Sequence, residues 1–238
     1  MKRRKTLLVC IVLFFLAALP AFGQRGNLEV DLGETTDSFA ALPKTTSPLV
    51  DFNGEAAILK SNPKTGRPAI VGGGEVFLPT DTAGHAREFA VYGGVNFQFG
   101  NLTVAVDGQI RKIYTPTAFE DNQYFARDKM ELIETPLVLR YKFASQKNWL
   151  KNWFAEAKGA PEYHPRFHEA SGSLVSLPNP NFDHGYFIQA SVGRTFGNWY
   201  AKASYETRYF KFIENQNNPN NLYNWKTNAV TGGVGIVF

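Results

Sequence analysis

The chain has 238 residues, a formal charge of +4 and a single cysteine, and 14% of its residues are aromatic. Its first 23 residues contain four basic side chains and no acid, so their removal takes the charge from +4 to zero. The sequence pI of about 9.1 therefore does not indicate a nucleic-acid surface. Without Cys10 the remaining chain has no disulfide and no thiol chemistry.

The first 23 residues have the layout of a cleaved secretory signal. A basic start, MKRRK, precedes an apolar run from Leu7 to Leu19 and a small-residue exit at Ala21 and Gly23. The run is shorter than the ~20 residues that a spanning helix needs, which argues against a membrane anchor. Cys10 lies early in this run, a position that does not favour a lipoprotein signal. We expect export and cleavage after residue 23.

Residues 24–66 are weakly patterned. The stretches GETTDSFAALPKTTSP and KSNPKTGRP are rich in Ser, Thr and Pro, which predicts a flexible N-terminal segment. Within this segment, Val50–Lys60 is compatible with either a strand or a short plug, and the sequence does not decide between them.

After Arg67 the polarity of the sequence alternates with a period of two, which is typical of strands. In NLTVAVDGQIRKIY, for example, Leu102, Val104 and Val106 fall on one face, and Asp107 and Arg111 on the other. The pattern predicts eight strands, each at least as long as the ~9–11 residues with which a tilted strand crosses a bilayer. They are expected at residues 67–79, 87–99, 101–115, 130–143, 152–166, 185–196, 199–212 and 228–238.

The connections between these strands alternate in length. Three are short, and two of these are the dipeptide Gly-Asn, at 100–101 and 197–198, whereas the others are longer and polar. This alternation predicts an all-β fold: an eight-stranded antiparallel transmembrane up-and-down barrel of the bacterial outer membrane, with short periplasmic turns and longer extracellular loops. The barrel is expected over residues 67–238, after a signal at 1–23 and a flexible periplasmic segment at 24–66. A soluble barrel with the opposite polarity is the alternative, and ten strands are also compatible with the sequence.

In a membrane barrel the polar face of each strand lines the lumen. Acids and bases occur there in near balance, so we expect them to pair, because an unpaired buried charge is costly. Eight strands leave a space that side chains nearly fill, so no wide pore is expected. The expected lumen charge network is Asp107, Arg111, Glu134, Arg140, Lys142, Glu156, Lys158, Lys202, Glu206 and Arg208.

Aromatic residues sort into two groups by the length of the nearest connection. The group beside the short turns and the C-terminus is Phe97, Phe99, Tyr141, Phe143, Phe196, Trp199 and Phe238. The group toward the long loops is Tyr114, Tyr163, Phe167, Tyr186 and Tyr209. Two such groups are expected where the two membrane–water interfaces lie.

Three stretches carry a resemblance to a known family. IETPLVLRYKF at 133–143, GGVNFQFG at 93–100 and a last strand ending in Phe238 resemble the small outer-membrane β-barrel family, which is described as porin-family or OmpA/OmpX-like. The resemblance covers residues 67–238. It implies an integral outer-membrane protein of a Gram-negative bacterium, surrounded by lipopolysaccharide. It also implies that the barrel assembly machinery recognises the last strand through Phe238.

Catalytic and metal sites are not expected. His164 and His168 lie about 13 Å apart along a strand, too far to share one ion, and the histidines are predicted to be polar loop residues. His168, Glu169 and Ser171 are the residue types of outer-membrane lipid A deacylases, but the spacing of His and Ser differs from that family by one residue.

The sequence thus predicts a non-catalytic barrel with a structural or surface-interaction role. It would be a monomer without cofactors and without a nucleic-acid partner, and would present loops at Phe119–Asp121, Glu169–Phe182 and Asn215–Tyr223. A narrow channel for small solutes or ions is the alternative. A lipid A-modifying enzyme of the outer leaflet is a second alternative.

Overall fold

The computed structural model describes residues 26–39, 44–60, 67–114, 127–144, 150–169, 181–215 and 218–238, and the predicted signal at 1–23 lies outside them. No helix among the described residues is long and apolar enough to cross a bilayer. The strands are β1 (Gly26–Phe39), β2 (Thr45–Leu59), β3 (Ala69–Pro79), β4 (Arg87–Phe99), β5 (Leu102–Tyr114), β6 (Arg127–Glu134), β7 (Leu137–Lys142), β8 (Trp153–Glu169), β9 (Asn181–Phe196), β10 (Trp199–Asn215) and β11 (Asn218–Val237).

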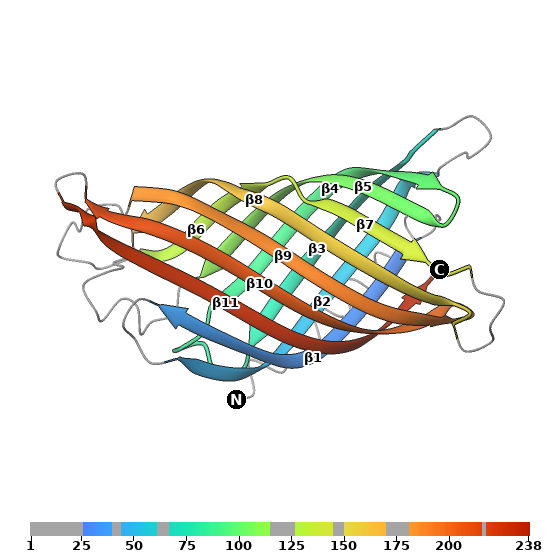
Figure 1. Cartoon of the computed structure of the whole chain (residues 1–238), viewed down its shortest axis with the longest axis horizontal. Coiled ribbons are helices and arrows are strands. Elements are labelled where there is room, and N and C mark those ends of the chain that lie inside the picture. Colours follow the sequence, from blue (N-terminus) through green and yellow to red (C-terminus); the bar gives the residue numbers. More distant parts are fainter. Residues whose placement is uncertain are drawn as a thin grey trace.

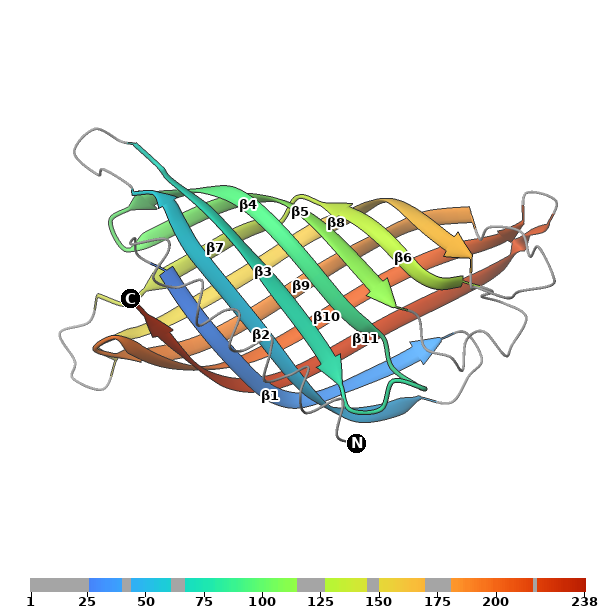
Figure 2. The same ribbon diagram turned by 180° about the vertical axis from the view of Figure 1, so that it is seen from behind.

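These strands form one closed antiparallel barrel. Each strand pairs with its neighbour along the chain, and β1 pairs with β11 over Asn27–Phe39, which closes the wall. β6 and β7 both pair with β5 on one side and β8 on the other, so they are two halves of one strand interrupted at Thr135 and Pro136. The barrel therefore has ten strands. Figures 1 and 2 show its wall from two opposite sides.

The prediction of eight strands was wrong, because residues 24–66 were assigned to a flexible segment. Within them the structure places β1 and β2, which add two strands to the wall. Leu28, Val30 and Leu32 alternate with inward acids in β1, but Gly, Ser, Thr and Pro around them weaken the period of two. The tight pairing of β1 with β11 supplies hydrogen bonds that this local sequence does not reveal.

Both ends of the wall can be distinguished by their connections. At one end, Gly100–Asn101 and Gly197–Asn198 each join two strands. At the same end, Gly26 and Phe238 exchange two backbone hydrogen bonds of 3.0 Å. We call this end the turn end. Gly100 and Gly197 have φ of 58° and 64°, which glycine adopts without a steric penalty. The opposite end, where β1, β3, β5, β8 and β10 finish, is the loop end.

The wall is taller on one side. β8, β9, β10 and β11 contain 17, 16, 17 and 20 residues, more than the ~9–11 that a tilted strand needs to cross a bilayer. Figure 1 shows β10 and β11 projecting furthest at the loop end. This side of the barrel therefore extends past the span that a membrane would cover.

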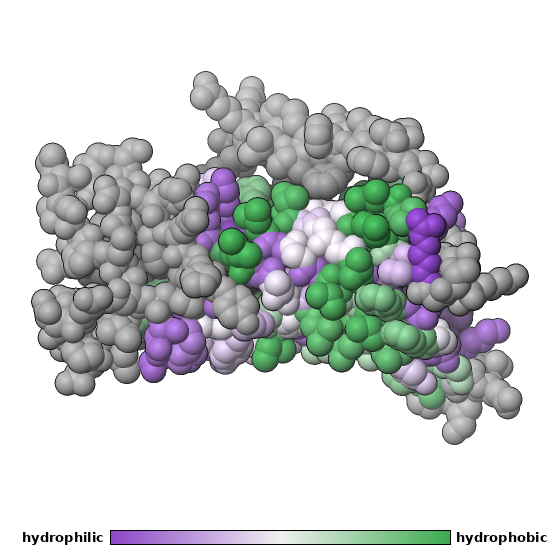
Figure 3. All heavy atoms as spheres, turned by 90° about the horizontal axis from the view of Figure 1, so that it is seen from above, coloured by the Kyte–Doolittle hydropathy of each residue, from purple (hydrophilic) through white to green (hydrophobic). Residues whose placement is uncertain are grey.

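The outer face of the barrel is apolar and the inner face is polar. Exposed large apolar side chains occur on nearly every strand, including Leu32, Ile58, Val91, Ile110, Ile133, Leu139, Ile188, Val192, Val230 and Val234. Figure 3 shows hydrophobic residues over much of the coloured part of its visible face, with hydrophilic residues gathered toward both sides. A soluble barrel would have the opposite polarity, so that alternative was wrong. The polarity is that of a barrel immersed in lipid.

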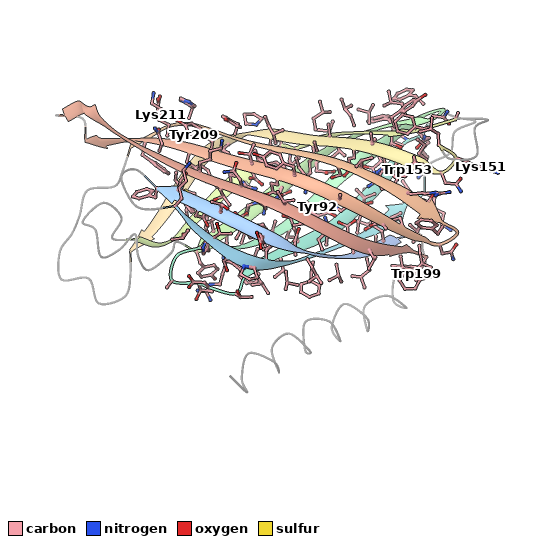
Figure 4. The ribbon with its side chains drawn as sticks, turned by 60° about the horizontal axis from the view of Figure 1, so that its bottom comes forward. Tyr92, Lys151, Trp153, Trp199, Tyr209 and Lys211 are labelled. Carbon is pink, nitrogen blue, oxygen red and sulfur yellow. The ribbon has the colours of Figure 1, made fainter. Side chains whose placement is uncertain are left out.

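Two aromatic belts flank the apolar band. Phe99, Phe196 and Trp199 are exposed at the turn end, and Tyr186 is exposed and Tyr209 half-buried toward the loop end. Figure 4 shows Trp199 and Tyr209 at opposite ends of the wall. Aromatic side chains prefer the two membrane–water interfaces, so the belts mark where the bilayer begins and ends.

An arginine on the outer face tests this orientation. Val91 is 72% exposed near the middle of β4, so Val91→Arg should destabilise the barrel by ~2–4 kcal/mol, because it places a charge in hydrocarbon. Phe99→Arg, on the same face of β4 at the turn-end interface, should cost only ~0–1 kcal/mol. Urea unfolding in lipid vesicles measures both values. Equal effects of the two substitutions would contradict the assignment of the outer face to lipid.

Candidate functional site: the barrel interior

An apolar layer fills the interior at the loop end. We call it the apolar seal; it consists of Phe39, Ala86, Ile113, Met130, Leu132, Phe210, Phe212 and Trp225. Trp225 packs on Phe210 with ring centroids 5.4 Å apart, and Phe210 packs on Phe212 at 6.0 Å. All of these side chains are almost completely buried. These buried side chains pack inside the barrel at this level of the wall.

A buried aspartate connects the seal to the loop between β3 and β4. Asp37 accepts hydrogen bonds from Trp225 Nε1 at 3.1 Å and Thr227 Oγ1 at 2.5 Å, and lies 2.9 Å from His85 Nδ1. His85 lies in the loop between β3 and β4, as expected for a polar loop residue, but it is buried. Its segment folds into the barrel mouth and adds Ala86 to the seal. His184 is exposed beside Asp183, and the side chains of His164 and His168 lie outside the described residues.

Beneath the seal lies a network centred on two arginines, which we call the two-arginine network. Arg111 bonds both carboxylate oxygens of Glu75, at 3.0 and 3.2 Å, and also Glu88 at 2.7 Å and Glu134 at 3.1 Å. Arg208 donates to Glu134 as well. Such bidentate, charge-assisted bonds are among the strong ones in proteins, and they hold the carboxylates in a fixed arrangement.

The network is completed by two further contacts. Arg208 also donates to Glu162, and Gln109 donates to Glu134 at 2.7 Å. Phe187 lies beside the cations, with its ring centroid 4.8 Å from the Arg208 guanidinium and 6.0 Å from that of Arg111. The ring covers a face of each guanidinium that has no carboxylate, which favours burial of the positive charge. The two-arginine network therefore forms a second layer of buried side chains beneath the seal.

A cavity lies between this network and the turn end; we call it the chamber. It offers about 80 Å³ to the centres of water molecules, and its lining is almost entirely polar. The residues around it are Asn27, Glu29, Asp51, Asn53, Glu55, Glu75, Tyr92, Asp107, Val138, Arg140, Glu156, Lys158, Gln189, Tyr200 and Lys202. Figure 4 shows Tyr92 near the middle of the wall.

Three ion pairs line the chamber, and one of their bases, Lys202, also contacts Asp31, which is not part of the lining. Lys202 Nζ lies 2.5 Å from Glu29 and 3.3 Å from Asp31, Arg140 Nε lies 2.6 Å from Glu156, and Lys158 Nζ lies 3.5 Å from Glu75. Arg140 and Glu156 face each other on the paired strands β7 and β8, and the contact of Lys202 with Glu29 crosses only β11. Lys158 on β8 and Glu75 on β3 lie several strands apart in the wall, so this contact braces the barrel across its interior.

Two tyrosines each cross one intervening strand to reach a hydrogen-bond partner. Tyr92 donates to Asn53 at 3.1 Å by lying over Gly73, where a Cβ atom would collide with its ring. Tyr200 donates to Glu29 at 2.6 Å. The chamber lining is thus fixed by hydrogen bonds as well as by ion pairs.

The predicted lumen residues are distributed over these layers. Arg111, Glu134 and Arg208 belong to the two-arginine network, and Arg140, Glu156, Lys158 and Lys202 form ion pairs at the chamber. Glu206 is buried and accepts a bond from Gln189 at 3.3 Å. Asp107 lines the chamber, and Lys142 is exposed at the turn end. The pattern of alternation thus identified the inward face of these strands.

The sequence-based list missed the contribution of the first two strands. β1 and β2 place five carboxylates inside the barrel, Glu29, Asp31, Asp37, Asp51 and Glu55, and neither strand contains a Lys, Arg or His. The interior therefore has more acids than bases, and the near balance expected for it was wrong. Only the alternation of Leu28, Val30 and Leu32 with polar residues could have revealed these positions.

The residues of the enzyme alternative are not brought together by the described structure. The whole loop between β8 and β9, including Ser171, lies outside the described residues, as do the side chains of His168 and Glu169. Among the described residues, no three His, Cys, Asp or Glu side chains are close enough to hold a metal ion directly.

Solved structures with a similar shape include the following two. Neisserial surface protein A (NspA) is 13% identical, with a TM-score of 0.40; the alignment covers 90% of this chain and 97% of that chain. A deletion mutant of the TodX monoaromatic hydrocarbon channel is 9% identical, with a TM-score of 0.31 and 90% coverage of each chain. No protein-family model and no curated protein matches the sequence. With TM-scores below 0.5, neither likeness assigns a function to this chain.

Proposed function

We propose that this chain is an integral protein of the bacterial outer membrane that neither catalyses nor conducts, and that presents its loop end to the cell exterior. The observation that carries this proposal is that two layers of buried side chains, the apolar seal and the two-arginine network, occupy the barrel interior. The predicted export signal and the apolar outer face support the location. The turn end would then face the periplasm.

A narrow channel is disfavoured by the same two layers. Ile113, Leu132 and Phe212 are fully buried in the seal, and Arg111 and Glu134 are fully buried below it. An ion would have to displace close-packed apolar side chains and then separate charges that are hydrogen-bonded to one another. Both steps are costly, since packed interiors have few voids and breaking a buried pair leaves an uncompensated charge.

Planar-bilayer recording tests this closure. We expect no unit conductance steps from the purified barrel, whereas an open porin inserted in the same bilayer gives them. The fraction of protein that migrates faster when unboiled measures how much is folded. Reproducible steps from a fully folded sample would contradict the proposal.

The tall side of the wall is the surface that we propose for interactions. Tyr186 and Tyr209 stack with centroids 5.4 Å apart, and Tyr209 donates to Asn224 at 2.8 Å. Lys211 pairs with Asp183 at 3.0 Å just beyond them. Figure 4 shows Tyr209 and Lys211 together at the loop end. Aromatic rings beside polar and cationic groups suit the headgroup region of lipopolysaccharide, which we propose as the surrounding lipid.

We also propose that the barrel is a monomer. β1 pairs with β11 over Asn27–Phe39, so the wall is closed over this span and has no free strand edge there that would favour association with a second copy. Size measurement in detergent, with the detergent mass subtracted, tests this point.

A further inference from the structure

The chamber contains carboxylates that have no partner. Asp51 and Asp107 are only 8% and 7% exposed, and both line the chamber. The Oδ1 atom of each accepts no hydrogen bond from the described residues. A buried, unsatisfied carboxylate oxygen is costly, so such atoms point to a group that satisfies them.

The charges around the chamber show what that group must carry. Its lining has six carboxylates and three bases, and each base forms one of the three ion pairs, with Glu29, Glu75 and Glu156. The remaining carboxylates are Asp51, Glu55 and Asp107. Within the described part of the chain, no ion pair joins any of them to a Lys, Arg or His. Three acids therefore face one cavity without a positive partner.

We propose that the chamber binds one hydrated divalent cation of the magnesium type. Mg²⁺ releases its waters reluctantly and often binds proteins through them. This suits a site where no three acidic or histidine side chains are close enough to hold an ion directly. The waters would donate to the oxygens of Asp51, Glu55 and Asp107, and the ion would neutralise their charge.

The size and lining of the chamber fit such an ion. The six waters around Mg²⁺ have their centres at 2.0–2.1 Å, on a sphere of about 40 Å³. The chamber offers about 80 Å³ to water centres, which leaves space for an additional water or two. Asn27 and Gln189 supply neutral amide oxygens at its wall, and the hydroxyl of Tyr92 lies there too. The site lies in the turn half, on the periplasmic side of both layers.

Two cations test the proposal on the full chain refolded in neutral detergent. Titration calorimetry at constant ionic strength should show one Mg²⁺ bound per chain. Hexaamminecobalt(III), whose ammonia ligands do not exchange, should compete for the same site, because binding needs only hydrogen bonds from the ligand shell. Asp51→Asn and Asp107→Asn should each weaken binding about tenfold, since each removes one charged hydrogen-bond acceptor.

Asp183→Asn is the matched control, because Asp183 is an exposed acid at the loop end, outside the chamber. It should bind both cations as the wild type does. Failure of both cations to bind the folded wild type would overturn the proposal, as would equal binding by the wild type and Asp51→Asn. If Mg²⁺ binds but hexaamminecobalt(III) does not compete, the hydrated form of the ion is wrong. The folded fraction of each variant, read from the unboiled gel, separates lost binding from misfolding.

Discussion

Arg111→Met is expected to destabilise the barrel by ~3–5 kcal/mol, as is typical when one partner of a buried ion pair is removed. Arg111 is completely buried and bonds Glu75, Glu88 and Glu134. Methionine fills similar space but leaves three carboxylates with fewer donors and no central charge. Arg208 still contacts Glu134, and its Nε lies 3.6 Å from Glu88. Among the described residues, Glu75 then keeps one basic partner, Lys158 at 3.5 Å. Urea unfolding in lipid vesicles measures the loss.

The matched control is Arg87→Met. Arg87 is exposed on the outer face and lies 5.3 Å from the centroid of the Tyr114 ring. Its replacement should cost at most ~1 kcal/mol. A double-mutant cycle with Glu75→Gln isolates the contribution of the bidentate pair, because the two substitutions should cost less together than the sum of their separate effects. Equal costs for Arg111→Met and Arg87→Met would mean that the two-arginine network does not hold the barrel together.

The alternation of residues predicted much of the wall. Between Arg87 and Tyr114 the predicted strands match β4 and β5, because inward and outward side chains differ sharply there and a Gly-Asn turn separates them. β6 and β7 were predicted as one strand, and the break at Pro136 is too local to alter the pattern. β1 was missed because Gly33, Thr35, Thr36 and Ser38 read as loop sequence, although they pair with β11 about 200 residues away.

The inward face could be predicted, but the contacts across it could not. Glu29 contacts Lys202 and Tyr200 across 171 residues or more, and Arg208 reaches Glu134 across 74. Such contacts depend on the radius of the barrel, and the radius depends on the number of strands. Because the sequence-based prediction omitted β1 and β2, its count of lumen charges lacked the five inward-facing acids of these strands. The excess of acidic side chains at the chamber could therefore not be predicted until all ten strands were known.

Trp225→Ala is expected to cost ~3–5 kcal/mol, comparable with the loss of Arg111, because it opens a cavity inside the apolar seal. Trp225 is 1% exposed, packs on Phe210 at 5.4 Å and donates to Asp37 at 3.1 Å. Trp225→Phe keeps most of the ring and removes the donor. Asp37 retains Thr227 and His85, so this milder change should cost ~1 kcal/mol for the hydrogen bond. The temperature at which the unboiled gel band is lost, with circular dichroism as a second probe, ranks the variants.

Trp199→Ala is the control for removing a tryptophan of the same wall. Trp199 is 56% exposed in the turn-end belt, so its loss leaves the interior packing unchanged and should destabilise less than Trp225→Ala. A smaller effect of Trp225→Ala than of Trp199→Ala would show that the seal is not packed.

Folded Trp225→Ala should still give no conductance steps, because Arg111, Arg208 and their carboxylates close the lumen beneath the seal. The two layers block the interior by different physical means, one by packing and one by paired charge, so loss of the first leaves the second in place.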